Sequence, residues 1–546
     1  MFQRIVHKVE GEGFSLRLEG CILTQPAIDL LLMPQGDSYG TVKLQARAMP
    51  RGDILANRIG LCLMHPMHAM GRVLEVEHVD GRISRSTFPE QVPAWPPFTG
   101  VRGIRHEFAP GHWAQVRFQG DDFEFEDQRN NADASFKTYS RSNTLPRPYV
   151  LRGGAAIEQS LTLHIEPALV AINPAPAQTR PVRLTDFAEV TRMPQLGLAI
   201  TPADAQASPL VQAALAEISP SLLHLTLALP EQPVHWTGIA QLLSASGAQL
   251  RLDLLAGVTA AALVRLAMAL RDAGIEPESV AVFPGTLSAL TAARLAFPAS
   301  ALGSGTPHFF AQFNRMDDVG PTDFLGFTIC SIVHSAEDAA PMAGLQSLPS
   351  LLATARVRYP GRALRIGPSS LGARSSPLGK QSASDGTRRI ALAARDPRPR
   401  GLFGTAWLLG HVTQAARADA EAVSVMSLRG DAGVLDEAID GRLRRHPTFF
   451  VLAQLARLKR LRAVTVSNLA GVAALAGACD GRDDWLIANL TSQTVDLTVG
   501  DAMPARVMDT AAWQAYVSGQ AESPWRVLRV KHAGVMQLDA FAIALK

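Results

Sequence analysis

The sequence predicts an α/β protein: a (β/α)8 TIM-like barrel flanked by an N-terminal β-domain and a small C-terminal β-sandwich. The hydrophobic pattern alternates with a period of two in the first third of the chain and again near its end. Between these regions, short apolar segments alternate with longer helix-like segments, which is the pattern of a parallel α/β fold. The predicted domains are residues 1–175, 183–460 and 462–546.

The N-terminal β-domain is predicted from short runs of alternating polarity that Gly, Pro and Asp turns separate. Four of these runs are residues 14–23, 72–81, 113–127 and 160–167. The segment "INPAPAQTRPV", residues 172–182, is rich in proline and has no periodicity. It is therefore predicted to be a domain boundary.

The barrel is predicted from eight apolar strand segments with Ala/Leu/Arg-rich helical segments between them. The eight strand segments are residues 196–201, 222–229, 249–256, 279–284, 309–314, 324–333, 363–368 and 422–428. Residues 209–218 and 259–274 are typical of the intervening helices. Eight strands with crossover helices fit a barrel better than an open doubly wound sheet. The first βα turn also lacks the Gly-x-Gly-x-x-Gly pattern of a dinucleotide-binding fold.

The last part of the chain returns to strand-like alternation in residues 485–500 and 534–546, which predicts a small β-sandwich. A β-domain, a barrel and a C-terminal β-domain are a common arrangement among enzymes that act on carbohydrates. That comparison is an analogy, because a fold alone does not determine a function.

The composition describes a globular protein and excludes several classes of partner. The chain has 546 residues, 47% hydrophobic and 18% charged, and a net charge of +3 from 52 basic and 49 acidic residues. This balance gives no electrostatic footprint for nucleic acid. The N-terminus has no apolar signal segment and no stretch is long and apolar enough for a membrane span, so a cytoplasmic setting is expected.

The cysteines and histidines give no sign of a metal site or cofactor. Cys21, Cys62, Cys330 and Cys479 lie far apart and form no ligand or disulfide pattern. "CLMHPMHAMG" places two histidines three residues apart, but no third ligand accompanies them. Neither a serine-hydrolase elbow nor a phosphate-binding loop is found. We therefore expect a reaction that needs no metal and no cofactor.

In a barrel enzyme the site lies where the strands end, so the residues after each strand are the candidates. Asn314 and Arg315 follow the predicted fifth strand, His334 the sixth and Arg374 the seventh. An imidazole can act as a general base near neutral pH, although a histidine can also cap a strand end. A barrel glycosidase needs two opposed carboxylates, which are expected after strands four and seven. "VFPGT" and "GPSSLG" stand there instead, which disfavours glycoside cleavage by that route.

The stretch "FEFEDQRNNADASFKTYS", residues 123–140, combines acids, bases and amides between aromatic residues. Its alternation predicts a strand that runs into a loop, with Phe125 and Phe136 anchoring the ends in a core. A rigidly held set of charges is what an electrostatic site requires. The same charges can instead pair with one another and act as a strut between domains. The residues alone leave both interpretations open.

This stretch strongly resembles the signature of the D-apionate lactonases, which open apionolactone in bacterial apiose breakdown. The match covers Glu126 to Asn130 and Asp133 to Tyr139, and continues in "NRIGLCLMHPM", "FPEQVPAWPPF", "GSGTPHFFAQFNR", "DFLGFTICSIVHSAEDA", "DPRPRGLFGTAWLLG" and "LIANLT". Asn131 and Ala132 depart from the family's Trp-Thr. Met426 stands in a segment where the family pattern has a glutamate.

The resemblance implies a carboxylic ester hydrolase that opens a sugar-acid lactone, with a small-molecule substrate. The chemistry needs a base for water, donors for the oxyanion and polar groups that hold the substrate. The catalytic candidates are His334, Glu126, Asp127 and Lys137. The substrate-binding candidates are Arg129, Asn130, Asp133, Asn314, Arg315 and Arg374.

Two alternatives stay open beside the lactonase interpretation. One is a non-catalytic or diverged carbohydrate-binding protein of glycosidase-like architecture. The other is a glycoside hydrolase-like enzyme with another substrate. Both alternatives stay open because the sequence departs from the family pattern at Asn131, Ala132 and Met426.

Overall fold

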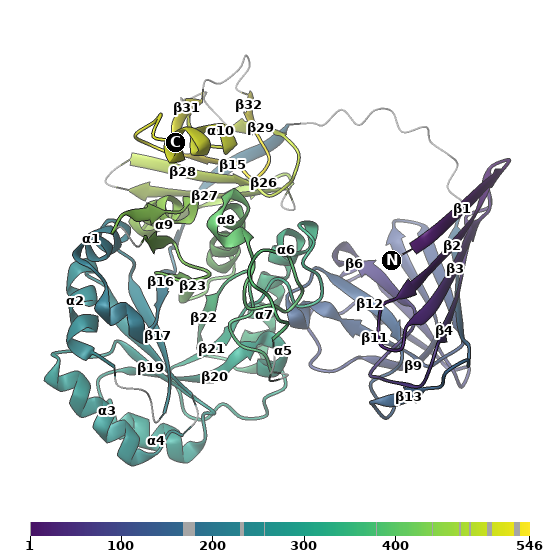
Figure 1. Ribbon diagram of the computed structural model, residues 1–546, viewed down its shortest axis with the longest axis horizontal. Coiled ribbons are helices and arrows are strands. Elements are labelled where there is room, and N and C mark those ends of the chain that lie inside the picture. The colour runs from purple at the N-terminus through teal and green to yellow at the C-terminus, as the bar shows by residue number, and fades with distance from the viewer. Residues whose placement is uncertain are drawn as a thin grey trace. The chain divides into compact units, whose positions relative to one another are not determined.

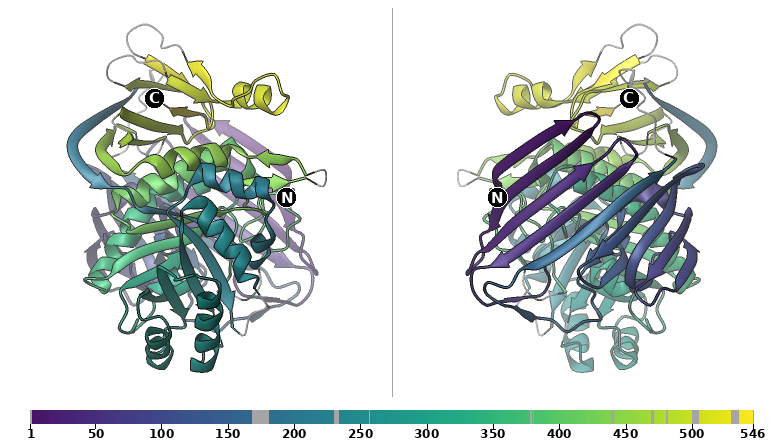
Figure 2. Two further views of the ribbon diagram at one scale, coloured as in Figure 1. Left: turned by 90° about the vertical axis from the view of Figure 1, so that its left-hand side faces the viewer. Right: turned by 90° about the vertical axis from the view of Figure 1, so that its right-hand side faces the viewer.

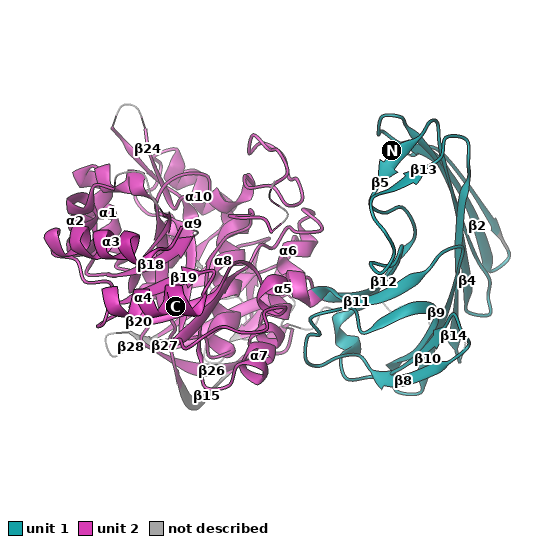
Figure 3. Ribbon diagram, turned by 90° about the horizontal axis from the view of Figure 1, so that it is seen from below, with its two compact units in different colours: residues 1–128, 135–178 teal, residues 129–134, 179–546 magenta. Residues whose placement is uncertain are grey.

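The computed structural model describes residues 2–167, 181–229, 234–255, 257–377, 379, 381–438, 441–468, 471–479, 482–499, 505–528 and 535–545. Most of the predicted boundary segment, residues 172–182, lies outside the described residues. The chain forms two compact units (Figure 3). The N-terminal unit contains residues 1–128 and 135–178, and the barrel unit contains residues 129–134 and 179–546.

The N-terminal unit is a β-domain, as predicted, built on one twelve-stranded sheet. Its long purple strands lie side by side in the right-hand view of Figure 2. The sheet runs β1-β2-β3-β4-β14-β10-β9-β11-β12-β6, with β7 on β9 and β8 on β7, while β5 and β13 form a separate pair. The strands are β1 (Phe2–Glu10), β2 (Gly13–Ile22), β3 (Ile28–Gly36), β4 (Thr41–Pro50), β5 (Ile54–Ala56), β6 (Cys62–Pro66), β7 (Val73–His78), β8 (Ile83–Thr87), β9 (Phe98–Ala109), β10 (His112–Gln119), β11 (Phe123–Asp127), β12 (Ser135–Ser140), β13 (Tyr149–Leu151) and β14 (Ile157–Glu166).

Alternation along the strands builds the core of this unit. On β10, Ala114, Val116 and Phe118 are buried, whereas Arg117 between them is exposed. Side chains two residues apart share a face of a strand, so the apolar set packs together while the polar set meets water. The predicted single run at 113–127 is in fact two strands, β10 and β11, joined by a turn at Gly120 with φ of 98°.

The barrel is confirmed: eight parallel strands close into a ring, with helices around it (Figure 1). The strands are β16 (Gln195–Ile200), β17 (Leu222–Ala228), β18 (Gln249–Leu255), β19 (Ser279–Phe283), β20 (Ala301–Phe309), β21 (Phe324–Thr328), β22 (Ala363–Ser369) and β23 (Ala422–Ser427). The helices of this part are α1 (Pro209–Ile218), α2 (Trp236–Ser246), α3 (Ala260–Asp272), α4 (Leu287–Ala296), α5 (Phe310–Phe313), α6 (Ala339–Gly344), α7 (Leu348–Arg358), α8 (Leu402–Arg417) and α9 (Pro447–Arg457). No helix among the described residues is long and apolar enough to cross a membrane.

Capping residues fix where the outer helices begin. The Ser208 side chain accepts a hydrogen bond from the Val211 amide, and Pro209 occupies the first turn of α1. Thr259 and Thr286 cap α3 and α4 in the same way. A side-chain oxygen at this position satisfies one of the amides that a helix leaves free at its start.

The fifth strand differs from the prediction, because residues 309–314 form the end of β20 and the short helix α5. The true strand, "ALGSGTPHF", looks unlike a strand because it contains two glycines. A Cβ at Gly303 would lie 2.2 Å from the Phe324 ring, and one at Gly305 would lie 2.2 Å from the Gly326 carbonyl oxygen. Close approach of β21 therefore excludes side chains from β20, which removes the hydrophobic signal that a strand normally carries.

The C-terminal β-domain is a nine-stranded sheet with the order β31-β30-β33-β28-β27-β26-β15-β29-β32. Its strands are β15 (Val182–Arg192), β26 (Arg460–Val466), β27 (Val472–Cys479), β28 (Arg482–Asn489), β29 (Val495–Val499), β30 (Ala505–Met508), β31 (Arg526–Leu528), β32 (Val535–Leu538) and β33 (Ile543–Leu545), with helix α10 (Thr510–Val517). The sheet takes β15 from before the barrel in the chain. Helix α8 is held close to this sheet, since a Cβ at Gly410 would lie 3.4 Å from Leu490.

The close packing of β20 against β21 gives a stability prediction. Gly305→Ala is expected to lower the free energy of unfolding by about 3 kcal/mol or more, because φ is +118° and the new methyl group meets the Gly326 carbonyl. Gly274→Ala is the matched control: its φ is +71°, but nothing lies within 4 Å of the added Cβ. It should cost about 1 kcal/mol. Chemical denaturation of both variants measures the difference, and equal losses would contradict the explanation.

Candidate active site

The loop between β11 and β12 belongs to the barrel unit, although both strands belong to the N-terminal unit (Figure 3). As predicted, Phe125 and Phe136 anchor its two sides: both are fully buried, and their rings stack with centroids 5.9 Å apart. Residues Gln128–Asn131 form a 3-10 turn between them. The segment that the sequence singled out is thus two strands that present a short, rigidly based loop.

Two residues of this loop are buried against elements at the C-terminal face of the barrel. Arg129 has 0% exposed surface and its guanidinium donates a hydrogen bond of 3.1 Å to Oγ of Ser350, in the first turn of α7. Asn130 accepts a hydrogen bond of 3.0 Å from the Asn314 amide, and both side chains are buried. Asn314 follows β20 and α5, so this face is the one where barrel enzymes carry their sites.

Asp133, in the same loop, meets His334 in the segment after β21. Asp133 Oδ2 lies 2.5 Å from Nδ1 of His334, and the imidazole keeps 38% of its side-chain surface exposed. The sequence placed both residues among the candidates but did not predict that they pair. A carboxylate on Nδ1 orients the ring and leaves Nε2 as the nitrogen that can accept a proton.

The backbone of the loop fits the barrel closely. Ala132 has φ of 64°, and its amide bonds to the Arg129 carbonyl at 2.8 Å. A Cβ at Gly344 would lie 2.5 Å from the Ala132 carbonyl oxygen. Gly344, at the end of α6, is therefore a residue of the site that the sequence did not reveal. Its signal, a glycine inside a short helix, is too common to be read alone.

Lys137 and Glu126 pair with each other inside the N-terminal unit. They are direct cross-strand neighbours of β12 and β11, 3.0 Å apart from Nζ to Oε2, and both are largely buried. Lys137 also lies 4.5 Å from the ring centre of Tyr139, whose hydroxyl donates to Glu124. Asp127 is buried as well.

Arg374 and Arg315 complete the predicted set. Arg374 follows β22 and its guanidinium donates to the Met426 carbonyl and, at 3.0 Å, to Ser427 Oγ at the end of β23. Arg374 is exposed, yet loss of surrounding water lowers its pKa to about 10. The two facts together describe a side chain that is recessed among protein atoms but reachable by solvent. Arg315 is half-buried beside Asn314 in the chain.

The barrel interior holds a charged network that was not predicted from the sequence. Asp253 on β18 lies 2.8 Å from His224 on β17 and accepts a hydrogen bond of 3.1 Å from Arg251. All three are buried, where barrels usually carry branched aliphatic side chains. Burial lowers the pKa of His224 to about 4 against the pull of Asp253. Arg251 and His224 hold the pKa of Asp253 at about 2 despite its burial. The signal was the polar residues at every second position of "LLHLTLAL" and "QLRLDLLA".

His65, one of the two histidines in "CLMHPMHAMG", lies in the core of the N-terminal unit and has a structural role. His65 is buried beside Phe88, Phe125 and His106, bonds to Thr138 Oγ1 at 2.9 Å, and has its pKa lowered to about 3 by burial. Across the described residues, no group of three His, Cys, Asp or Glu side chains is arranged to hold a metal ion.

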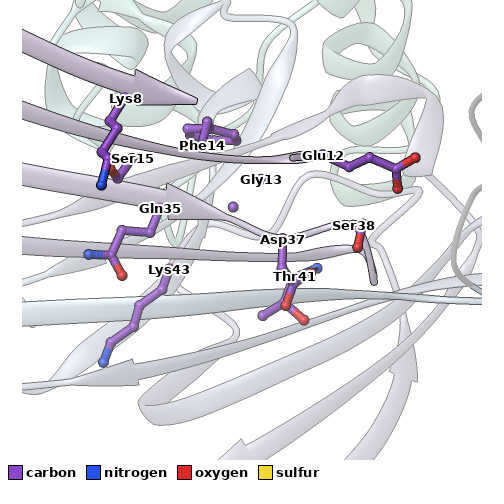
Figure 4. Close-up of a pocket in the computed structure, with 11 residues that line it drawn as sticks. Lys8, Glu12, Gly13, Phe14, Ser15, Gln35, Asp37, Ser38, Thr41 and Lys43 are labelled. Carbon is purple, nitrogen blue, oxygen red and sulfur yellow. Dashed lines mark hydrogen bonds between the residues drawn. The ribbon is translucent and has the colours of Figure 1, made fainter. Parts of the chain in front are cut away.

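A polar hollow of about 570 Å³ lies on strands β1 to β4 of the N-terminal unit (Figure 4). Lys8, Ser15, Gln35 and Lys43 face one another in register across four neighbouring strands. None of the predicted site residues lines it. A row of polar side chains is the ordinary solvent face of an antiparallel sheet, so we assign the hollow no role.

The fold is a TIM barrel that carries a cluster of polar side chains at its C-terminal face, where barrel enzymes have their sites. The chain belongs to the D-apionate lactonase family: residues 2–168 match the model of the family's N-terminal domain and residues 196–460 match that of its TIM barrel domain. It is 31% identical over 497 residues to the D-apionate lactonase of Brucella anthropi, covering 86% of this chain and 78% of that protein.

Solved structures with a similar arrangement include a family 51 α-L-arabinofuranosidase from Bifidobacterium longum (12% identity, TM-score 0.46). A GH30 endoxylanase from Clostridium papyrosolvens C71 is similar to the same degree (12% identity, TM-score 0.44). Each alignment covers 67% of this chain and 99% of the other. These likenesses are too distant to bear on the activity.

The buried histidines of the barrel unit predict how its stability depends on pH. His224 and His411 both have a pKa of about 4 in the folded protein, because burial disfavours the charged ring. As pH falls from 6.5 to 4, the unfolded chain takes up protons that the folded chain does not. Stability should fall by up to about 1.4 kcal/mol per pH unit for each histidine and be unaffected by them above pH 6.5. Asp253 acts in a lower window, between pH 3.8 and about 2.

His411→Phe tests this prediction, because it keeps a flat ring against Trp407 and removes the titration. The free energy of unfolding is measured by denaturant at pH 7.5 to 4.5. Its slope against pH should correspond to about one fewer proton taken up on unfolding in the variant. An unchanged slope would mean that His411 is protonated in the folded protein.

Proposed function

We propose that this protein is a carboxylic ester hydrolase that opens a sugar-acid lactone, with D-apionolactone as the substrate to test first. Membership of the D-apionate lactonase family supports the class of reaction. The observation that carries the proposal is the Asp133–His334 pair, because the loop of the family signature supplies the carboxylate that orients a barrel histidine.

In the proposed reaction His334 is the general base. Asp133 accepts a hydrogen bond from Nδ1–H of His334, which leaves the Nε2 lone pair to take a proton from water as the water attacks the lactone carbonyl. The carboxylate then stabilises the imidazolium that forms. The imidazole can return this proton to the departing ring oxygen, so that one residue serves both halves of the reaction.

Asn130, Asn314 and Arg129 have a supporting role in this proposal. The Asn130–Asn314 hydrogen bond and the buried Arg129 hold the loop against the barrel. Asp133 is therefore already in place beside His334, and no conformational entropy is lost in bringing the two together during the reaction. Such preorganisation contributes directly to rate, since a base must sit within hydrogen-bonding reach of the water. Asn314 and Arg315 remain proposed substrate contacts.

A glycoside hydrolase remains the less favoured alternative. The strand ends that would carry its two carboxylates, after β19 and β22, read "PGT" and "SLG". These positions therefore provide no carboxylate that could act as the general acid or the nucleophile of a glycosidase. A carbohydrate-binding protein without activity would bind sugar acids but turn over no lactone.

His334→Ala is expected to lower kcat by roughly 100-fold or more, because the base is lost. Asp133→Asn should lower kcat by roughly 10- to 100-fold with a smaller effect on KM, since the ring is still present but misoriented. Rates are measured with D-apionolactone and a panel of aldonolactones. His164→Ala is the matched control, because His164 is also exposed, at 39%, beside a carboxylate, Glu166. Full activity of His334→Ala would reduce His334 to a structural residue.

We propose a second test at Lys137 and Glu126, the ion pair expected from the sequence to act in catalysis; it distinguishes a catalytic role from a purely structural one. Lys137→Met should cut activity by roughly 100-fold and also destabilise, since it leaves Glu126 with a buried, unpaired charge. Glu126→Gln combined with Lys137→Met should restore stability. If these residues serve the reaction, activity stays low in the double variant.

Recovery of both activity and stability in the double variant would show that the pair is only structural. The ion pair between Arg117 on β10 and Glu77 on β7, 3.0 Å apart across β9 of the same sheet, is the control for removing an ion pair. Its removal should leave turnover unchanged.

A further inference from the structure

We propose that Arg374 is the anchor for a carboxylate, so that the site binds the open hydroxy-acid product more tightly than a neutral molecule of the same shape. This inference rests on the proposed lactone hydrolysis. It goes further by specifying that the site prefers a negatively charged ligand. It predicts that sugar-acid anions of the aldonate class are ligands and product inhibitors.

Arg374 has no acidic partner among the residues that the structure describes. In the described parts of the chain its guanidinium donates only to uncharged oxygens, the Met426 carbonyl and Ser427 Oγ, and forms no ion pair. Loss of water alone lowers its pKa, with no carboxylate acting against it. An arginine whose partners are all neutral oxygens keeps its full charge available for an anion from solution.

Other arginines of this unit are neutralised. Arg251 pairs with Asp253 in the barrel interior, Arg365 pairs with Glu278 and Glu421, and Arg398 pairs with Asp396 and Asp338. The His224 ring feels the positive charge of Arg374, which further disfavours its protonation. Arg374 therefore acts as an uncompensated positive charge at the ends of the strands.

Arg374 is held firmly while staying accessible. The residues on both sides of it are anchored: the Ala373 amide bonds to the Ala393 carbonyl at 2.9 Å, and Ser375 Oγ bonds to the Pro307 carbonyl at 2.8 Å. The carbonyl that receives the guanidinium belongs to Met426, which has φ of 53°. A non-glycine residue in this region is strained, and such strain is common where a functional group must be aimed.

The chemistry of the reaction supplies the missing anion. Water adds to the lactone carbonyl carbon, and the ring bond between that carbon and the ester oxygen breaks. The departing oxygen takes a proton and becomes a hydroxyl group, and the new carboxylic acid loses its proton. A neutral ring thus becomes a chain with a charge of −1, and negative charge already develops on the carbonyl oxygen during attack. A planar guanidinium can hold both oxygens of that product through paired hydrogen bonds.

The test compares D-apionate with its neutral amide by calorimetry on the full chain. The wild-type protein should bind D-apionate at least 10-fold more tightly than the amide, and the preference should weaken as salt is added. Arg374→Met should bring the two affinities within about 3-fold of each other. Arg374→Lys should be intermediate, because it keeps the charge but loses the paired geometry.

Arg294→Met is the matched control, because it makes the same change of net charge at an exposed arginine of α4 that is already paired with Asp323. It should leave the preference for the anion intact. Equal wild-type affinities for D-apionate and its amide, a measurement that needs no variant, would overturn the inference, as would an undiminished preference in folded Arg374→Met.

Hydrolysis of D-apionolactone by the wild type is measured separately. Turnover without an Arg374-dependent preference for the anion overturns the carboxylate anchor and leaves the proposed reaction standing. Absence of turnover on all aldonolactones overturns the proposed reaction itself, whatever the binding data show.

Discussion

The burial of one guanidinium group is the constraint on which the candidate site depends. Arg129 has no exposed surface, and a buried arginine is tolerated only where hydrogen bonds replace the water it has lost. Ser350 on α7 provides one of these bonds. The guanidinium of Arg129 reaches its hydrogen-bond partner only when the loop is in place, so its burial also fixes the position of the other loop residues. Asn130 is then held at Asn314 and Asp133 at His334.

Most of the fold could be predicted because its elements follow local periodicity. Residues 209–218 were predicted as a helix and form α1 with those bounds, since a serine cap and a proline mark its start. The fifth strand could not be found in the same way. Its glycines are dictated by how closely β21 approaches, and that distance is a property of the closed barrel rather than of nine consecutive residues.

The candidate residues could be named from the sequence, but their pairing could not. Asp133 and His334 are 201 positions apart, and Arg129 and Ser350 are 221 apart. No periodicity links such positions, so the hydrogen bond that gives Asp133 its proposed task becomes visible only in three dimensions. The converse holds for Arg251 and Asp253, which lie two residues apart in a strand that reads as apolar. There the spacing was visible, but the closed barrel gives it meaning by turning both side chains inward.

The pairing of charged side chains distinguishes residues that stabilise the barrel from residues that are available to bind a ligand. Inside the barrel, Asp253 is satisfied by Arg251 and His224, so these groups hold one another and have little left to offer a ligand. Arg374 differs, because its partners are neutral oxygens and its charge is not cancelled. An arginine without an acidic partner gains no ion-pair stabilisation from the fold. Functional sites are where such unpaired charges persist, since the missing partner arrives with the ligand. The same reasoning explains why the strained Met426 and the unpaired Arg374 occur together: they aim one positive charge at solvent.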